Sequence, residues 1–447
     1  MSSEWRLTKL GSLVDIKHGF AFKGEFFSEA PTCYQLTTPG NFAIGGGFQS
    51  EKVKYYNGPV PSDFVLKAGD LLVTMTDLSK AADTLGYAAK VPPKAGGMWL
   101  HNQRVGLVGL KSGANASRDF LHYLMRSPDY RHWVVSTATG STVKHTSPSR
   151  ICDYEFLLPP TEVQHEIAAT LDALDNRITL LRETNATLEA IAQALFKSWF
   201  VDFDPVRAKM AGRAPEGMGE ATAALFPDAF GESALGLVPK GWEMRPISEV
   251  IEGVYDGPHA TPPEADAGPV FLGIKNLTGT ALDFSDIRHI NEADWAKWTK
   301  RVTPQAGDIV FSYEATLGFF ALIPPDLRCC LGRRLALIRP RFEQGAGHFW
   351  FHQFVAAPFQ GLLTKHTIQG ATVNRIALKE FPSYPVLVPP LPLQMAFHEV
   401  ASSVWAKIQR NQAQAQALAA LRDALLPRLI SGQVRLPEAL PLIEEAL

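Results

Sequence analysis

The sequence predicts an α+β protein with two similar mixed α/β lobes, each followed by a long helix, and with the two helices pairing as an antiparallel coiled coil. Three observations support this fold class. A heptad seam of apolar residues runs through residues 161–200, a matching seam returns in residues 391–430, and four short landmarks occur twice in the same order. A repeat that joins a lobe to a helix implies a duplicated unit.

The first long helix is predicted over residues 161–200 because apolar residues alternate there at steps of four and three. The seam consists of Ile167, Leu171, Leu174, Ile178, Leu181, Asn185, Leu188, Ala192, Leu195 and Trp199. At about 1.5 Å per residue this helix would extend roughly 60 Å, which favours pairing with another helix. An ordinary amphipathic core helix is the alternative. Leu180, Ile191 and Phe196 lie off the seam, and we expect them to face a partner protein.

The second long helix repeats the first after 230 residues, from Phe397 to Leu429, and Arg422 interrupts its apolar seam. A Pro-Pro pair precedes both helices, and such a pair ends a strand and starts a helical turn. Antiparallel pairing places Asn185 opposite Asn411. The same register aligns three apolar pairs, Leu171 with Leu425, Leu181 with Ala415 and Leu188 with Ile408. A buried Asn pair would fix the register at a cost in stability, whereas Asn side chains at a helix edge would face solvent.

The domain boundaries follow from the helices and the repeated landmarks. We predict lobe 1 over residues 1–160, the first helix over 161–200, a connector with at most short helices over 201–240, lobe 2 over 241–390, the second helix over 391–430 and a C-terminal tail over 431–447. A further helix is expected over residues 118–131. The landmarks are Trp5-Arg6-Leu7 with Trp242-Glu243-Met244, Ala68-Gly69-Asp70 with Ala306-Gly307-Asp308, Gln103-Arg104-Val105 with Arg333-Arg334-Leu335, and Gly140-Ser141-Thr142 with Gly370-Ala371-Thr372.

Composition indicates a soluble cytoplasmic protein. No run of eighteen apolar residues and no signal-peptide pattern occurs, and the four cysteines have no disulfide-like or metal-like spacing, so we expect free thiols. The net charge of −2 argues against binding nucleic acid through bulk positive charge. Lobe 1 nevertheless contains more Lys and Arg than Asp and Glu, whereas the segment 161–240 is acidic. Part of any affinity for DNA would then come from partner subunits.

At these landmarks the chain resembles the specificity subunit of a type I restriction-modification system, and the resemblance covers nearly its whole length. It implies two target-recognition domains held apart by two antiparallel helices, each reading a few base pairs of a bipartite, asymmetric site in double-stranded DNA. It also implies that the helices dock two methyltransferase subunits, which modify adenine, and that these recruit motor-nuclease subunits. S-adenosylmethionine, ATP and Mg are expected in those partners, and no cofactor is expected in this chain.

Motifs for catalysis and metal binding are missing from the sequence. No Pro-Pro pair has the Asn/Asp-Pro-Pro-aromatic form of an amine methyltransferase, and no GxxxxGK[ST] loop for ATP occurs. His165-Glu166 and His398-Glu399 each lack the second His of a zinc site. We therefore expect a non-catalytic chain. The rival hypotheses are a restriction-modification enzyme with its own nuclease or methylase activity, and a non-catalytic coiled-coil scaffold with two protein-binding lobes.

Loops and basic positions are the candidates for DNA contact. The glycine loops would bring N–H groups and hydroxyls to a phosphate, the arginines in apparent strands would bind guanine, and Asn276 would read adenine. Plain glycine turns, solvated or ion-paired arginines and turn-forming Asn residues are the alternatives. The candidates are Lys17, His18, Arg104, Gly140, Ser141, Thr142, Lys144 and His145 in lobe 1, and His259, Thr261, Lys275, Asn276, Arg333, Arg334, Gly370, Thr372, Asn374 and Arg375 in lobe 2.

Overall fold

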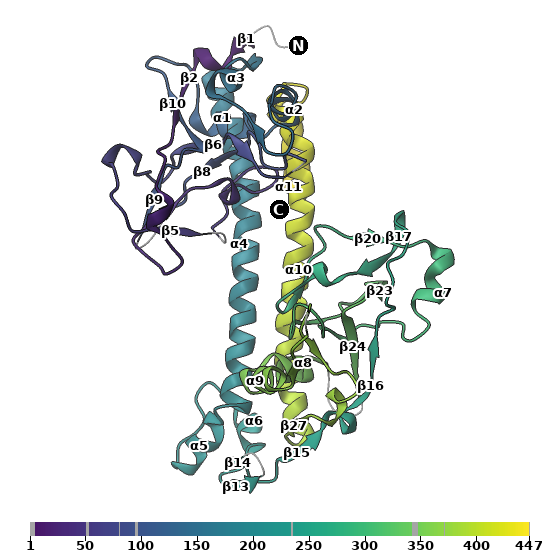
Figure 1. Cartoon of the computed structure of the whole chain (residues 1–447). Helices are drawn as coiled ribbons and strands as arrows, with labels where there is room; N and C mark the ends of the chain where they lie inside the picture. The colour runs from purple at the N-terminus through teal and green to yellow at the C-terminus, as the bar shows by residue number, and fades with distance from the viewer. Residues whose placement is uncertain are drawn as a thin grey trace. The chain divides into compact units, whose positions relative to one another are not determined.

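The computed structural model of the chain describes residues 5–50, 53–79, 81–93, 97–233, 236–341, 347–370 and 372–446. Ala371, in the second predicted glycine loop, lies outside these ranges. The chain divides into two compact units, Met1–Leu181 with Ala413–Leu447 (unit 1) and Arg182–Gln412 (unit 2). Each unit contains one lobe and segments of both long helices, which Figure 1 colours from teal to yellow.

Lobe 1 is built on a four-stranded sheet in the order β2-β10-β6-β8 and a second sheet in the order β3-β5-β4-β9, in which β4 and β9 run parallel. The terminal strands β1 and β12 pair with each other and close the lobe. The strands are β1 (Arg6–Lys9), β2 (Val14–His18), β3 (Phe27–Ser28), β4 (Tyr34–Leu36), β5 (Lys54–Tyr56), β6 (Leu71–Thr74), β7 (Thr76–Asp77), β8 (Ala88–Lys90), β9 (Met98–Leu100), β10 (Val105–Leu110), β11 (Lys144–His145) and β12 (Glu155–Leu158).

Lobe 2 repeats the strand order of the main sheet and the parallel pair of lobe 1, while its second sheet has three strands instead of four, so the structure confirms the predicted fold class of two similar mixed lobes. Its main sheet has the order β16-β24-β21-β22, its parallel pair is β17 with β23, and β15 pairs with β27. The strands are β15 (Glu243–Pro246), β16 (Ile251–Asp256), β17 (Ala265–Leu272), β18 (Leu277–Thr278), β19 (Ala281–Leu282), β20 (Arg288–His289), β21 (Ile309–Ser312), β22 (Phe320–Leu322), β23 (Cys329–Leu331), β24 (Leu335–Pro340), β25 (Thr367–Ile368), β26 (Arg375–Ile376) and β27 (Pro385–Val388).

The Ala-Gly-Asp landmark forms the same turn before β6 and β21. Gly69 and Gly307 have φ angles of +82° and +86°, which glycine adopts without steric cost. The following carboxylates close each turn, because Asp70 accepts from the Lys67 N–H and Asp308 accepts from the Gln305 N–H, both at 2.8 Å. The landmark therefore marks the entry into the central part of each sheet.

The expected helix over residues 118–131 is two helices, α1 (Arg118–Leu124) and α2 (Pro128–Ser136). Pro128 explains the break, since proline lacks an N–H and favours the first turn of a new helix. Lobe 2 has the matching pair α8 (Gly347–Val355) and α9 (Ala357–Lys365). The short helices α3 (Pro148–Cys152) and α7 (Trp295–Trp298) complete the lobes.

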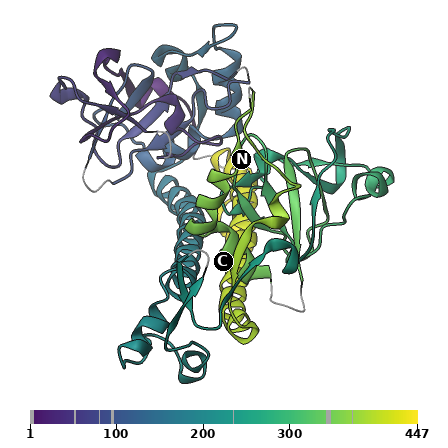
Figure 2. The same ribbon diagram turned by 60° about the horizontal axis from the view of Figure 1, so that its bottom comes forward.

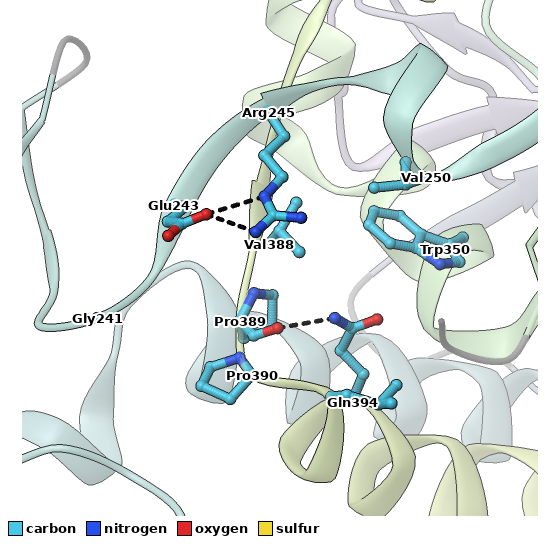
Figure 3. A pocket seen from close by; sticks show the side chains of 10 residues that line it. Gly241, Glu243, Arg245, Val250, Trp350, Val388, Pro389, Pro390 and Gln394 are labelled. Carbon is cyan, nitrogen blue, oxygen red and sulfur yellow. Dashed lines mark hydrogen bonds and ion pairs between the residues drawn. The ribbon is translucent and has the colours of Figure 1, made fainter. Parts of the chain in front are cut away.

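The long helices are α4 (Thr161–Phe200) and α10 (Leu391–Ile430). A buried glutamine attaches the start of each helix to its lobe. Gln164 Nε2 donates to Pro159 O at 2.8 Å, and Gln394 Nε2 donates to Pro389 O at 2.7 Å. Figure 3 shows Gln394 turned back toward Pro389 in the pocket where β15, β27 and α10 meet.

Within each unit, a stretch of α4 lies beside a stretch of α10 (Figures 1 and 2). In unit 1 the shared core includes Leu171, Leu181, Ala415 and Leu425, and in unit 2 it includes Ile408. Leu180 and Ile191 are exposed as expected. The expectation for Phe196 was wrong, because this side chain is only 2% exposed and packs against Phe349 and Phe397.

Arg422, the charged interruption of the second seam, has a partner in α4. Its Nη1 lies 2.5 Å from Asp175 Oδ1, and Asp175 Oδ2 accepts from Arg126 Nη1 of lobe 1 at 2.7 Å. Burial opposes ionisation of Asp175, but Arg126 and Arg422 outweigh it and lower its pKa to about 2. An ionised carboxylate therefore joins lobe 1 to both helices inside unit 1.

The connector contains short helices, as predicted, and also a hairpin that the sequence did not indicate. The elements are α5 (Asp204–Met210), α6 (Glu220–Ala224), β13 (Phe230–Ser233) and β14 (Gly236–Pro239). The predicted C-terminal tail carries a further helix, α11 (Leu436–Ala446), whose Ala439 and Ile443 join the core of unit 1.

Candidate nucleic-acid interface

The basic residues of lobe 1 lie at one end of its main sheet. In the antiparallel pair of β2 and β10, Lys17 is opposite Leu107 and His18 is opposite Gly106. Arg104 immediately precedes β10, and its carbonyl oxygen accepts from the Met75 N–H at 3.0 Å. All three basic side chains are exposed. The structure thus brings together three candidates from two distant parts of the sequence.

The predicted glycine loop of lobe 1 is a hairpin anchored at the same end. Thr139 and His145 exchange both backbone hydrogen bonds, at 2.8 and 2.9 Å. Gly140 has φ +96°, and a Cβ there would lie 2.0 Å from Val143 O, so this turn requires glycine. The Thr146 N–H donates to Met75 O, which ties the hairpin to the segment that also holds Arg104. Ser141 and Thr142 are exposed at the tip.

A buried carboxylate lies in the strand that pairs with this hairpin. Asp77 lies in β7, opposite Lys144 of β11, and His145 Nδ1 lies 3.2 Å from Thr76 Oγ1. Burial opposes ionisation of Asp77, but hydrogen bonds from Thr84 and Ser79 outweigh burial and lower its pKa. The Asp77 carboxylate thus holds the turn that follows β7, next to Lys144, which is only partly exposed.

In lobe 2, several candidates line one hollow of about 280 Å³. Its lining includes five predicted residues, Thr261, Lys275, Asn276, Arg333 and Arg334. Arg288 of β20 also lines the hollow, and sequence reasoning missed it because it belongs to no motif and no repeated landmark. The hollow therefore collects four basic side chains from three separate segments.

The remaining lobe 2 candidates lie outside that lining. His259 is exposed, and its Nε2 lies 3.1 Å from Asp256 Oδ2. Gly370, Thr372 and Arg375 are exposed, and Asn374 Oδ1 accepts from the Gly370 N–H at 3.4 Å. A bridge between Glu314 and Arg375 joins this loop to the segment after β21.

Arg104 and Arg334 occupy equivalent positions in the two lobes. The Arg334 carbonyl oxygen accepts from the Tyr313 N–H at 3.1 Å, just as Arg104 accepts from Met75. The expectation that Arg104, Arg333 and Arg334 lie in strands was wrong, because all three lie in the two-residue turn that precedes β10 or β24. Arg334 has φ +75°, an unfavourable angle for a residue with a Cβ.

The prediction that Asn276 reads adenine does not fit the fold. Asn276 is 3% exposed, its Oδ1 accepts from the Gly273 N–H, and its Nδ2 donates to Asp283 O and Asp286 O. Asn41 makes the equivalent turn in lobe 1, where its Oδ1 accepts from the Thr38 N–H. Both Asn side chains therefore stabilise a turn.

Three histidines form a separate group in unit 2, of which His352 is buried and His348 and His398 are partly buried. His348, His352 and His398 lie near Trp405, whose Nε1 donates to His352 Nε2 at 3.1 Å. Burial lowers the pKa of His348 to about 4 and that of His352 to about 3. A second, smaller cause is the charge of a neighbouring histidine, His398 for His348 and His348 for His352. Both are neutral at physiological pH. Within the described ranges, no group of three or more His, Cys, Asp or Glu side chains could hold a metal ion.

No helix within the described ranges combines the length and the apolar character needed to cross a bilayer.

Known proteins similar to this chain are specificity proteins of type I restriction-modification systems. Residues 2–190 match the family described as the type I restriction modification DNA specificity domain. The specificity subunit of the type I restriction enzyme MjaIX from Methanocaldococcus jannaschii is 25% identical over 326 residues, covering 72% of this chain and 70% of that protein. The HindI specificity subunit from Haemophilus influenzae is 25% identical over 362 residues, covering 71% and 77%.

A solved structure shares the fold. The S subunit of a type I restriction-modification system from M. genitalium superposes with a TM-score of 0.52 at 15% identity. The superposition covers 96% of this chain and 97% of that chain.

Proposed function

We propose that this chain is a specificity subunit like the proteins it resembles, and that its two lobes read the two halves of one bipartite, asymmetric DNA target. Recognition of a DNA target is the role of this family. The assignment of one half-site to each lobe is supported by one observation above all, the recurrence of the same basic turn, at Arg104 and Arg334, next to main sheets of the same strand order.

The basic side chains suit a division of labour between phosphate and base contacts. Lysines, exposed glycine loops and hydroxyls bind phosphates, which positions a protein on the duplex without reading its sequence. Lys17 and the Ser141-Thr142 tip fit this role in lobe 1, and Lys275 fits it in lobe 2. Arginine side chains next to these groups supply donors for base edges in the major groove.

We propose further that this chain performs no chemistry of its own. Its partners would be two methyltransferase subunits that modify adenine with S-adenosylmethionine, and motor-nuclease subunits that use ATP and Mg. The exposed apolar side chains Leu180 and Ile191 of α4 support a docking surface for such subunits. A cytoplasmic location follows from the proposal, because the DNA substrate is there.

Methylation mapping tests this function. The chain is co-expressed with the methyltransferase subunit of its own system in a host without other adenine methylation, and methyl-adenine is located by single-molecule sequencing. We expect one motif with two specified halves and an unspecified spacer. If the complex assembles and no motif appears, the chain is a scaffold with two protein-binding lobes. Methyl transfer by the isolated chain would contradict the absence of catalysis.

A further inference from the structure

We infer that residues 103 and 333 are equivalent base-reading positions, at which Gln103 of lobe 1 selects an A·T pair and Arg333 of lobe 2 selects a G·C pair. The inference rests on the proposed function, because it names the base pair that one residue of each lobe reads.

The two residues occupy the same place in the same turn. The turn before β10 is closed by a hydrogen bond from the Val105 N–H to Asn102 O at 3.0 Å. The turn before β24 is closed by the corresponding contact from Leu335 N to Gly332 O at 3.4 Å. Gln103 and Arg333 are the first of the two residues inside these turns, and both are exposed.

The backbone holds each turn firmly in place. Gly19 follows β2 so closely that a Cβ there would lie 2.1 Å from Asn102 O, and a Cβ on Gly257 would lie 2.2 Å from Gly332 O. Both turns therefore pack directly against the end of the neighbouring strand. Because the backbone is already fixed, binding has to order only the side chain, which suits a contact that must discriminate between bases.

Arg333 differs from the other cations of its hollow in having no carboxylate partner. Lys275 pairs with Asp286 at 2.5 Å, Arg288 pairs with Glu264 at 3.4 Å, and Arg334 pairs with Glu314 at 3.8 Å. Within the described part of the chain, the Arg333 guanidinium makes no hydrogen bond or ion pair, and the Gln103 amide makes no hydrogen bond. Their donors and acceptors are free for a ligand, whereas those of Asn276 are engaged in the fold.

The chemistry of the two side chains predicts which base pair each selects. A guanidinium donates two parallel hydrogen bonds to guanine O6 and N7, and a glutamine amide accepts from adenine N6 while donating to N7. One such bidentate pair discriminates against a wrong base by roughly tenfold to a hundredfold. The two half-sites would therefore differ at this position because the lobes carry different residues at one shared place.

Reciprocal substitutions test the inference in the complete complex. Arg333→Gln and Gln103→Arg exchange the two side chains, and Arg333→Lys keeps the charge but removes the bidentate geometry. Arg213→Gln is the matched control, since Arg213 is exposed in the connector. Methylation motifs are mapped for each variant, and binding of each complex to duplexes with single base-pair changes is measured at one salt concentration.

We expect Arg333→Gln to change one half-site at one G·C position, to A·T or to no preference, and Arg333→Lys to relax the same position by roughly tenfold to a hundredfold. Gln103→Arg should change the other half-site at one A·T position, and Arg213→Gln should keep the wild-type motif. An unchanged motif in Arg333→Gln and Gln103→Arg overturns the inference while leaving the proposed function intact. If the variants bind every duplex more weakly by the same factor, both residues contact phosphates and not bases, and the inference is also overturned. A wild-type complex without any motif counts against the proposed function itself.

Discussion

Asn411 Nδ2 donates a hydrogen bond to Asn185 Oδ1 at 2.8 Å, across the interface between α10 and α4. Asn185 Nδ2 in turn donates to Ile408 O at 3.2 Å, and Asn411 is only 1% exposed. A polar pair thus lies among the apolar residues that the two helices bury in unit 2. Such a pair disfavours shifted registers, because slippage would leave buried amides without partners.

Replacing one member of the Asn pair should lower the stability of the chain more than replacing both. In Asn411→Leu the Asn185 Oδ1 loses its donor, while Asn185 Nδ2 keeps its bond to Ile408 O, and we expect a loss of about 1–3 kcal/mol in stability. In the double variant Asn185→Leu/Asn411→Leu apolar side chains replace both amides, and we expect a midpoint of thermal unfolding at or above that of the wild type. Calorimetry on the purified chain measures this difference. Equal losses in the single and double variants would contradict a role of the pair in setting register.

Asp175→Asn should destabilise unit 1 strongly. The substitution removes the carboxylate that pairs with Arg126 and Arg422. Arg422 keeps Asp423 as a partner, whereas Arg126 loses its ion pair, and its side chain is only 5% exposed. Leaving a buried cation uncompensated costs roughly 3–5 kcal/mol. The control is Asp153→Asn, whose carboxylate is 60% exposed in its ion pair with Lys9 and should contribute little. Similar unfolding midpoints for the two variants would show that the buried network does not hold lobe 1 to the helices.

Stability should fall in mild acid because of the buried histidines. The pKa of His348 lies at about 4 in the folded chain, whereas an unfolded histidine titrates near 6.5. The folded state excludes the proton that the unfolded state accepts, so the stabilisation is complete above pH 6.5 and is lost as the pH falls towards 4. His348→Phe should flatten this dependence, measured as unfolding midpoints between pH 8 and pH 5. The exposed control His132→Gln should keep the wild-type slope.

Gly257→Ala should impair DNA binding by lobe 2 without unfolding the chain. The new Cβ would displace the turn that carries Arg333 and Arg334, because the Gly332 carbonyl oxygen has no room to accommodate it. We expect the dissociation constant for the target duplex to rise at least tenfold. Losing one base contact costs about 1.4 kcal/mol, which corresponds to a tenfold change in affinity. Gly361→Ala of α9 is the control, since nothing lies within 4 Å of its Cβ position. Wild-type affinity in Gly257→Ala would mean that the turn does not touch DNA.

Lys275→Ala should weaken binding to all DNA sequences alike. A phosphate contact contributes through counterion release, so the slope of log affinity against log salt should fall by about 1 while the methylation motif stays the same. Fluorescence titration of the complex with target and non-target duplexes at several salt concentrations measures this slope. A change of motif in this variant would assign Lys275 to base reading instead.

Local patterns were sufficient for much of the architecture. The heptad spacing gave the helices α4 and α10, and the Pro-Pro pair with Gln164 or Gln394 marked where they begin. These features are readable because they depend on residues a few positions apart. Pro128 carried a readable signal as well, and its effect as the start of a second helix explains the error in the predicted helix over residues 118–131.

The candidate interface was only partly readable. Basic residues and glycine loops identify themselves by type, but Arg288 reaches the hollow of lobe 2 through a strand that no motif marks. Asn276 has the same residue type as a base-reading side chain, and only its three hydrogen bonds reveal that it stabilises a turn. Composition cannot separate a free side chain from one that the fold already uses.

The sequence by itself determined the duplication, the two long helices and the resemblance to specificity subunits, because period, order and spacing are properties of a linear chain. Only the tertiary structure decided which charges are paired and which are free. Arg422 appeared as a flaw in the seam, yet it binds Asp175, and Arg333 appeared equal to Arg334, yet Arg334 alone pairs with Glu314. The physical reason is that pairing depends on distances between residues far apart in the sequence, and these distances are set when the sheets and helices pack.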